Sequence, residues 1–470
     1  MARGAALSLF IWGFSALGCD AGGELRTQLL VIIDTDLPTV LQAGEREELS
    51  ADTAVDAVRI DIYREDGSSI DSIVLVAPSP RDWPISFGIP ALDGVEAVTV
   101  QARVFRADRA QVAIGDEGDQ LLPQRALTVD RLVSLSFPET GIRVARFSLT
   151  GDCMGVPPSF QVPASTCLSA EQLSAPASEG VEVDGDAGPR PSRVGSWPLA
   201  VEQPCSGSPP AGALCIKGGV STLGEEALTG ATDGFVFAYD PAPLRPVLLS
   251  PFFADGEEYT VGRLRQALKQ DPALLEDGQV VIRDPANDLK ALCTYLGPES
   301  AENDALPLNC VDHPGARKLC LAEGGDLLSE AQWEHAARGR GQGRPYAWGS
   351  SAPDCCHGNF GGCEGRPVIA GSSACAQQGD KTRDGLLDMT GNLTELVLDS
   401  HLPYDSPCWS QLGLLKDRIC EDASIETKTW RGGNFKESGE ISHLALRRQG
   451  GTGSPINSAG FRCGHSDVAR

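Results

Sequence analysis

Fifteen cysteines constrain this 470-residue chain more than any other feature of its sequence. A disulfide holds two Cα atoms within about 7 Å of each other, so the pairing of cysteines restricts which folds are possible. Several cysteines are near neighbours in the sequence and therefore predict local disulfides. These pairs are Cys153 with Cys167, Cys205 with Cys215, Cys293 with Cys310, and Cys408 with Cys420.

Four further cysteines form a cluster, for which two disulfides and a zinc site are the two interpretations. The four are Cys355, Cys356, Cys363 and Cys375. No two of them have the Cys-x-x-Cys spacing that is typical of zinc ligands, so the sequence favours disulfides.

The N-terminus predicts an exported lipoprotein, with residues 1–18 as its signal peptide. Arg3 precedes an apolar run from Ala5 to Leu17, which is shorter than the roughly 20 residues that span a bilayer. The run leads into Gly18-Cys19, which resembles a bacterial lipoprotein box in which Cys19 takes the lipid. An ordinary signal peptide with a chance cysteine is the alternative. Without Cys19 an even number of cysteines remains, which suits an oxidising compartment.

The formal net charge of −25 excludes some classes of partner. A surface this acidic repels nucleic-acid phosphates and anionic lipid head groups. We therefore expect no nucleic acid, and membrane contact only through the N-terminal lipid, which would place the chain at the cell envelope.

Residues 24–150 predict a small β-sandwich domain. Apolar and polar residues alternate at 58–63, and the pattern returns at 70–76 after Asp66-Gly67, a pair that is typical of tight hairpin turns. Further alternating stretches at 97–105, 132–137 and 142–149 fit several short strands joined by turns. We interpret this domain as a spacer. Residues 169–210 are small, polar and rich in proline, so they predict a linker.

The second half of the chain contains a series of glycine- and aromatic-rich motifs, which come in a fixed order. They are Ile216-Lys217-Gly218-Gly219, Ser329-Glu330-Ala331-Gln332-Trp333-Glu334, Tyr346-Ala347-Trp348-Gly349, Met389-Thr390-Gly391-Asn392, Trp430-Arg431-Gly432-Gly433 and Gly460-Phe461-Arg462-Cys463. Together they make residues 212–466 resemble the formylglycine-generating-enzyme (sulfatase-modifying factor) family. The resemblance implies an irregular α+β domain that is related to C-type lectins.

Local chemistry agrees with that fold class. Ser329 and Gln332 have the spacing of a capping box at a helix start, and Trp333, Ala336 and Ala337 then lie on one helical face. Fifty-three glycines and 32 prolines fit a domain that is rich in loops.

The resemblance also implies a catalytic pair and a disulfide. In the family, two cysteines soon after the Gly-Gly strand bind Cu(I) and oxidise a cysteine of a sulfatase to formylglycine. Glu437 and Ser442 stand at those positions, and no cysteine lies between Cys420 and Cys463. Oxygen ligands do not suit Cu(I), so copper is not expected and no catalytic residue is assigned. The family's structural disulfide would join Cys320 to Cys463.

A structural calcium site is a further implication of the resemblance. The family binds Ca²⁺ through the segment that matches Asp388, Gly391, Leu393 and Glu395, and both acids are present here. Carboxylate and carbonyl oxygens suit this hard cation. A plain turn with solvated acids is the alternative.

The leading functional hypothesis is therefore a non-catalytic binding or scaffold module, with an envelope protein or a glycan as its partner. The alternative is an active formylglycine-generating or related oxidoreductase acting on a protein cysteine. A calcium-dependent glycan binder is a third possibility.

Overall fold

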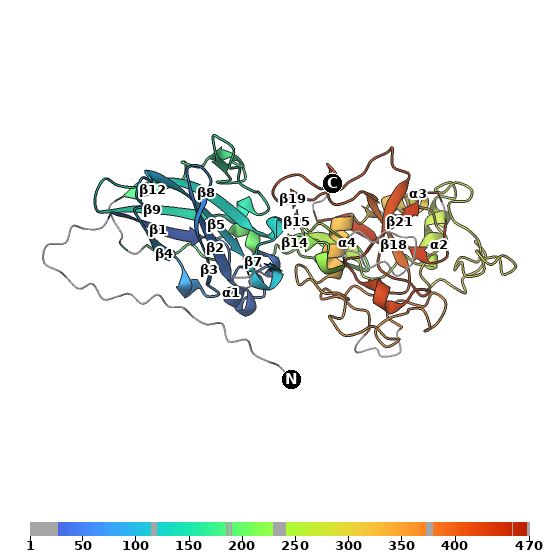
Figure 1. Ribbon diagram of the computed structural model, residues 1–470. Coiled ribbons are helices and arrows are strands. Elements are labelled where there is room, and N and C mark those ends of the chain that lie inside the picture. The colour runs from blue at the N-terminus through green and yellow to red at the C-terminus, as the bar shows by residue number, and fades with distance from the viewer. Residues whose placement is uncertain are drawn as a thin grey trace.

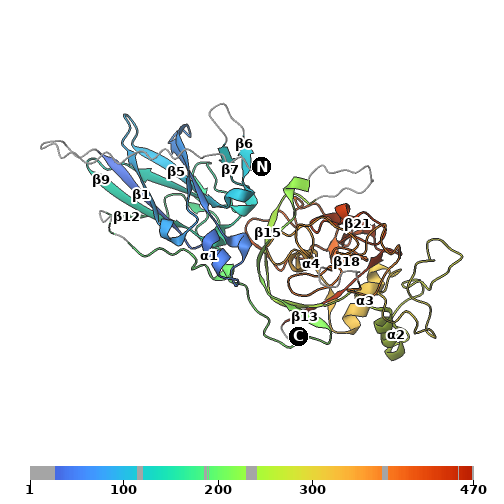
Figure 2. The same cartoon turned by 90° about the horizontal axis from the view of Figure 1, so that it is seen from below.

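The computed structural model describes residues 27–113, 120–184, 188, 190–228, 241–372, 379–453 and 455–467. A β-rich domain and a second domain of mixed strands, helices and loops lie side by side, and both views separate them clearly (Figures 1 and 2). Residues 1–18 and Cys19 lie outside the described residues. No helix among the described residues is both long enough and apolar enough to cross a bilayer.

The first domain is the expected β-sandwich, built from two four-stranded sheets. One sheet has the order β12-β9-β1-β4, and the other has the order β3-β2-β5-β8. Their strands are β1 (Gln28–Thr35), β4 (Ile85–Pro90), β9 (Ile142–Leu149), β12 (Glu182–Asp184), β2 (Ala57–Arg64), β3 (Ser69–Val76), β5 (Ala97–Phe105) and β8 (Val129–Ser136). Alternate side chains of both sheets, such as Val31, Ile60, Val100 and Val133, fill one core.

Strands β2 and β3 form the predicted hairpin, in which Val58 faces Leu75 and Ile60 faces Ile73. Gly67 has a φ of +82°, the conformation that the Asp-Gly turn requires. Smaller elements complete the domain: α1 (Val40–Glu45), β6 (Gln111–Ala113) paired with β7 (Gln120–Leu122), and β10 (Ser165–Thr166) paired with β11 (Ala175–Pro176).

The prediction of a linker over residues 169–210 is wrong for most of that stretch, which packs on the sandwich. β12 pairs with β9, and Trp197 is buried in the first domain's core, where its Nε1 donates to Asp152 over 2.9 Å. The Cys153–Cys167 disulfide secures the start of this stretch. Composition misleads here because the segment gains its hydrogen bonds from the edge of a sheet and needs only a few buried side chains of its own.

In the described part of the second domain there are three small sheets and three short α-helices. The sheet orders are β13-β16-β23-β17, β14-β15-β19 and β21-β20-β18-β22. The strands are β13 (Ala213–Ile216), β14 (Gly219–Leu223), β15 (Arg245–Leu249), β16 (Phe252–Asp255), β17 (Asp326–Leu327), β18 (Thr394–Ser400), β19 (Leu415–Lys416), β20 (Thr427–Arg431), β21 (Arg447–Gly451), β22 (Ala459–Gly460) and β23 (Cys463–Ser466). The helices are α2 (Val261–Gln270), α3 (His313–Ala322) and α4 (Glu330–Ala337). This irregular α+β architecture is the predicted one.

Helix α4 begins with the predicted capping box. Ser329 Oγ accepts from the Gln332 amide over 3.1 Å, and Gln332 Oε1 accepts from the Ser329 amide over 3.0 Å. Each bond satisfies a backbone N–H that a helix start otherwise leaves unpaired. Trp333, Ala336 and Ala337 are fully buried, so α4 lies in the middle of the domain.

The two domains meet through buried polar contacts. Asp52 of the first domain accepts from the Thr222 amide at the start of the second over 2.6 Å, and Arg109 Nη1 lies 2.5 Å from the same carboxylate. At the boundary itself, the Glu202 amide donates to the Glu48 carbonyl of the sandwich over 2.7 Å. The Glu202 carboxylate, only 2% exposed, pairs with Arg340 and Arg383. These contacts fix the second domain to the first.

Six disulfides join described residues. They are Cys153–Cys167, Cys205–Cys215, Cys293–Cys310, Cys320–Cys463, Cys355–Cys363 and Cys408–Cys420. All four local pairs predicted from spacing are present, as is the pair implied by the resemblance. Cys356 is also disulfide-bonded, which fits the disulfide interpretation of the cluster, and Cys375 lies outside the described residues.

Candidate functional site

The loop that follows β20 holds the two positions where the resemblance places catalytic cysteines. Gly432 has a φ of +75°, and a Cβ on Gly433 would overlap the Oγ of Ser442. The chain therefore folds back so that Ser442 lies directly against Gly433. Only glycine permits so close an approach of a side chain to the backbone.

At these two positions, the side chains have partners within the protein. Ser442 is 1% exposed, and its Oγ donates to the Ser438 carbonyl over 3.4 Å. The Glu437 carboxylate pairs with the Arg448 guanidinium, and its backbone carbonyl accepts from the Gly361 amide over 2.7 Å. A hydroxyl and a paired carboxylate offer neither a thiolate for Cu(I) nor a thiol nucleophile.

No described cysteine supplies a free thiol elsewhere either. All thirteen cysteines among the described residues are disulfide-bonded. A thiol in a disulfide is not available as a soft ligand or a nucleophile until the bond is reduced.

Aromatic side chains stand beside this loop. The Tyr346 ring stacks on Trp348 at a centroid distance of 5.0 Å, and the Trp348 ring stacks on His357 at 4.7 Å. His443, next to Ser442, lies 6.0 Å from Tyr346. Burial lowers the pKa of His443 to about 3, with further lowering by Arg338 and Arg431, so this imidazole is neutral at physiological pH.

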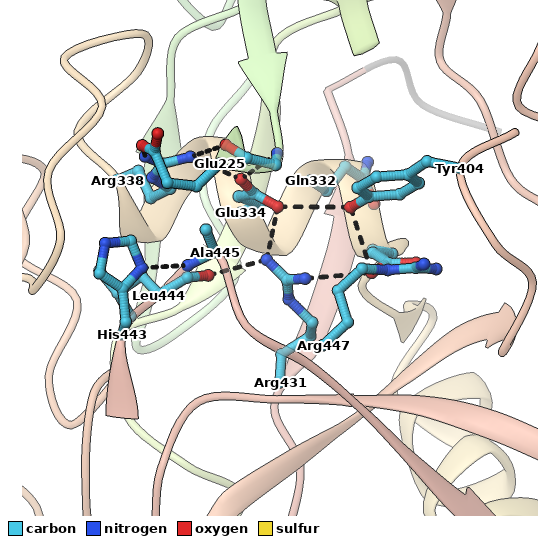
Figure 3. A network of polar contacts seen from close by, with 12 residues as sticks. Glu225, Gln332, Glu334, Arg338, Tyr404, Arg431, His443, Leu444, Ala445 and Arg447 are labelled. Carbon is cyan, nitrogen blue, oxygen red and sulfur yellow. Dashed lines mark hydrogen bonds and ion pairs between the residues drawn. The ribbon is translucent and has the colours of Figure 1, made fainter. Parts of the chain in front are cut away.

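Behind the loop, two carboxylates of α4 form a buried network with arginines of the neighbouring sheet. Glu330 and Glu334 lie one turn apart and point the same way, which brings both within reach of Arg431. The Arg431 Nη1 lies 3.1 Å from Glu330 and its Nη2 lies 2.5 Å from Glu334. Figure 3 shows Glu334 between Arg431, Arg338 and the Tyr404 hydroxyl. Arg447 adds a second pair with Glu330, at 2.6 Å.

The charged side chains of this network have ion-pair partners inside the protein. Burial disfavours ionisation of Glu330, but the guanidinium groups of Arg447 and Arg431 outweigh it and keep the pKa of Glu330 below its ordinary value. Burial raises the pKa of Tyr404, and the carboxylates of Glu330 and Glu334 raise it further. The network therefore holds α4 against the sheet β21-β20-β18-β22.

The segment with the predicted calcium ligands lies at a second group of buried acids. Asp388 is 4% exposed with a φ of +56°, and its Oδ2 accepts from the Gly371 amide over 2.8 Å. The amide of Gly391 donates to Asp380, and the amide of Leu393 donates to Glu258. Burial raises the pKa of Glu258, and the charges of Asp388 and Glu395 raise it further, while Arg462 lowers it. Three buried carboxyl groups, those of Glu258, Asp388 and Glu395, thus lie near the Arg462 guanidinium.

Glu395, the fourth predicted ligand, already has strong partners. Both its oxygens lie 2.9 Å from the Arg462 Nε, and Oε2 also accepts from the Trp333 indole over 2.7 Å. A calcium ion at Glu395 would share the carboxylate with Arg462. Within the described residues, no three His, Cys, Asp or Glu side chains are grouped so that they could hold a metal. A cation here would therefore depend on carbonyl oxygens, as the resemblance implies for Gly391 and Leu393.

Sequence reasoning missed Glu258 as a member of this group. Its Oε2 accepts from the Asn392 side chain over 2.6 Å, and its Oε1 accepts from the Leu393 amide over 3.0 Å. Glu258 precedes α2 and is far from 388–395 in the chain, so no local pattern connects them. Only the tertiary fold brings them together.

Comparison with known proteins identifies the second domain. A family model described as "Sulfatase-modifying factor enzyme 1-like domain" matches residues 200–466. None of the curated proteins matches the chain.

Among the solved structures that are similar to the chain, three each cover 54% of it. PvdO from Pseudomonas aeruginosa is 21% identical over 94% of its own length, with a TM-score of 0.43. Variable protein 1 of Treponema denticola is 15% identical over 94% of its length, with a TM-score of 0.38. CarF is 14% identical over 97% of its length, with a TM-score of 0.35.

The family model begins at residue 200, slightly before the predicted start at 212, and confirms the predicted family. Because the model covers more than half of the chain, this protein belongs to the sulfatase-modifying factor (formylglycine-generating-enzyme-like) family.

Proposed function

We propose that the family domain is a non-catalytic binding or scaffold module, presented at the cell envelope by a lipid on Cys19. The observation that carries this proposal is the environment of Glu437 and Ser442. One is ion-paired and the other is buried and hydrogen-bonded, where the family's chemistry needs two thiols. Polar partners within the protein favour a fixed shape over a reactive site.

Copper-dependent oxidation tests the proposal. The mature full chain is loaded with Cu(I) and mixed with a Cys-x-Pro-x-Arg peptide, while oxygen uptake and the mass of the peptide are followed. We expect neither tight copper binding nor oxidation of the peptide. The double variant Glu437→Cys with Ser442→Cys is the matched control and should gain Cu(I) affinity. Oxygen uptake with peptide oxidation by the unmodified chain would identify an active oxidoreductase instead.

We also propose that Ca²⁺ binds at Asp388, with the carbonyls of Gly391 and Leu393 and a carboxylate oxygen that Glu395 shares with Arg462. The excess of buried carboxyl groups over nearby guanidinium groups supports this site, because a divalent cation offsets like charges in a dry interior.

Calcium removal gives the corresponding prediction. Calcium at 100 times its Kd should stabilise the folded chain by about 2.7 kcal/mol, which thermal unfolding with and without EDTA measures. Asp388→Asn should abolish the response, while Asp422→Asn, which changes an exposed acid in the same domain, should keep it. An equal response in both variants rules out Asp388 as a ligand.

A further inference from the structure

The second domain carries a groove at the end farthest from the sandwich. It has a volume of about 430 Å³, within the usual range of ligand-binding sites. One wall comes from the chain between α2 and α3, a long stretch in which no helix or strand occurs. The other wall comes from residues 366–369. In both views the connection beyond α2 lies on the side of the second domain that faces away from the sandwich (Figures 1 and 2).

Both walls are held in place from behind. The first is closed by the Cys293–Cys310 disulfide, and Asn303 Nδ2 donates to the Thr294 carbonyl over 2.8 Å. The second is clamped by Asn392, which accepts from the Val368 amide over 3.0 Å and donates to the Val368 carbonyl over 3.1 Å. Asn392 is fully buried. The groove is therefore preformed, which lowers the entropic cost of binding a ligand.

The lining of the groove contains both apolar and basic side chains. Leu292, Leu306, Val368 and Ile369 line it, and Ile369 is 50% exposed. Ile282, also 50% exposed, precedes the lining residue Arg283. Exposed apolar side chains gathered at a concave site mark an interaction surface more often than isolated ones do.

Charge at the groove is reversed relative to the whole chain. Two guanidinium groups, Arg283 and Arg366, line it against a single carboxylate, Glu302, whereas the chain has 64 acidic and 39 basic residues. Both arginines are exposed, and neither forms an ion pair with any described residue. Such a lining favours a partner that has both carboxylates, which can pair with the arginines, and apolar side chains.

We propose that this groove docks an extended peptide segment of another protein in which apolar and acidic side chains alternate. The apolar side chains lie against Leu292, Leu306 and Ile369, and the carboxylates pair with Arg283 and Arg366. The inference rests on the proposed binding function and names the site and the chemistry of the partner. The clamp through Asn392 also connects the groove to Glu258 and to the segment of the proposed calcium site.

Fluorescence polarisation tests the proposal on the mature full chain. The probes are a labelled octapeptide of alternating Leu and Asp, and the same peptide with Lys in place of Asp. We expect saturable, salt-sensitive binding of the Leu–Asp peptide only. The double variant Arg283→Glu with Arg366→Glu should weaken it about tenfold, since two exposed attractive pairs become repulsive. Ile369→Ser should also weaken it.

Matched controls are Arg81→Glu, an exposed arginine of the sandwich, and Ile419→Ser, which is 46% exposed elsewhere on the second domain. Both should bind like the unmodified chain. Binding of both peptides alike, or unchanged binding by the groove variants, overturns the proposal. So does self-association that Ile369→Ser abolishes, or phosphatidylglycerol-vesicle binding that the arginine variants abolish. None of these outcomes bears on copper oxidation, so the groove can fail while the non-catalytic function stands.

Discussion

Single polar residues in the second domain are buried together with their partners. Glu330, Glu334 and Arg431 are at most 1% exposed, and each is ion-paired. Breaking such a pair leaves a charge that is neither hydrated nor neutralised, which usually costs about 3–5 kcal/mol. Ser442 is also buried with a partner, since its hydroxyl donates to the Ser438 carbonyl.

Buried neutral histidines make stability depend on pH. His335 of α4 is 2% exposed, its ring lies 2.9 Å from the Lys217 carbonyl, and burial lowers its pKa to about 4. The unfolded chain binds this proton near pH 6.5, so the contribution of His335 to stability is complete above that pH and is lost as pH falls towards 4.

For one such histidine, the free energy of unfolding falls by about 1.4 kcal/mol for each pH unit of acidification between those limits. Urea unfolding at several pH values from 7 to 4.5 should therefore show a shallower fall for His335→Gln than for the unmodified chain. The difference between the slopes isolates this histidine from the carboxyl groups that titrate in the same window. Parallel curves would contradict the assignment.

Among the elements, those with local signals were predictable from sequence. The β2–β3 hairpin follows from its alternation and its Asp-Gly turn, and the start of α4 follows from Ser329 and Gln332. The order of the sheets was not predictable, because β1 pairs in parallel with β9, whose residues lie more than 100 positions away. β12 looked like part of a linker because its hydrogen bonds come from β9.

The candidate site was likewise predictable from sequence only in part. The order of the motifs along the chain identified Glu437 and Ser442 as the positions that match the family's two cysteines, since both follow the Gly432-Gly433 pair at a fixed interval. It could not show that Glu437 meets Arg448, or that Glu258 joins Asp388 and Glu395. Those contacts depend on loops whose paths have no periodic pattern, and only the packed fold determines them.

The disulfide that joins α3 to β23 gives a prediction about how strongly these two elements are held together. Cys320 and Cys463 are separated by 143 positions, and Cys355 and Cys363 by 8. Loop-closure entropy predicts a loss of about 5 kcal/mol for Cys320→Ser with Cys463→Ser, against about 2.5 kcal/mol for Cys355→Ser with Cys363→Ser. Denaturant midpoints measure both. Equal losses would show that local strain outweighs chain entropy.

The whole molecule combines an acidic chain with the proposed lipid on Cys19. A chain with a formal net charge of −25 gains nothing from anionic head groups, so on this proposal the lipid alone would supply the attachment. Cys19 precedes β1, which begins at Gln28, by nine positions. A chain of that length reaches at most about 30 Å, so the sandwich would stay close to the bilayer.

Cys19→Ala tests the anchor. We expect the unmodified protein to partition into the detergent phase of Triton X-114 and to incorporate labelled palmitate. The variant should lose the label and move to the aqueous phase, because no helix among the described residues is long and apolar enough to cross a bilayer. A variant that stays with the membrane would require a different mode of attachment.

The contacts of Glu202 and Asp52 across the domain boundary have a mechanical consequence. A boundary held by buried hydrogen bonds resists rotation of one domain against the other, whereas a flexible linker would let the second domain turn freely. A force on a partner bound to the second domain would thus be transmitted to the sandwich. The face of the second domain that points away from the sandwich would keep a fixed orientation.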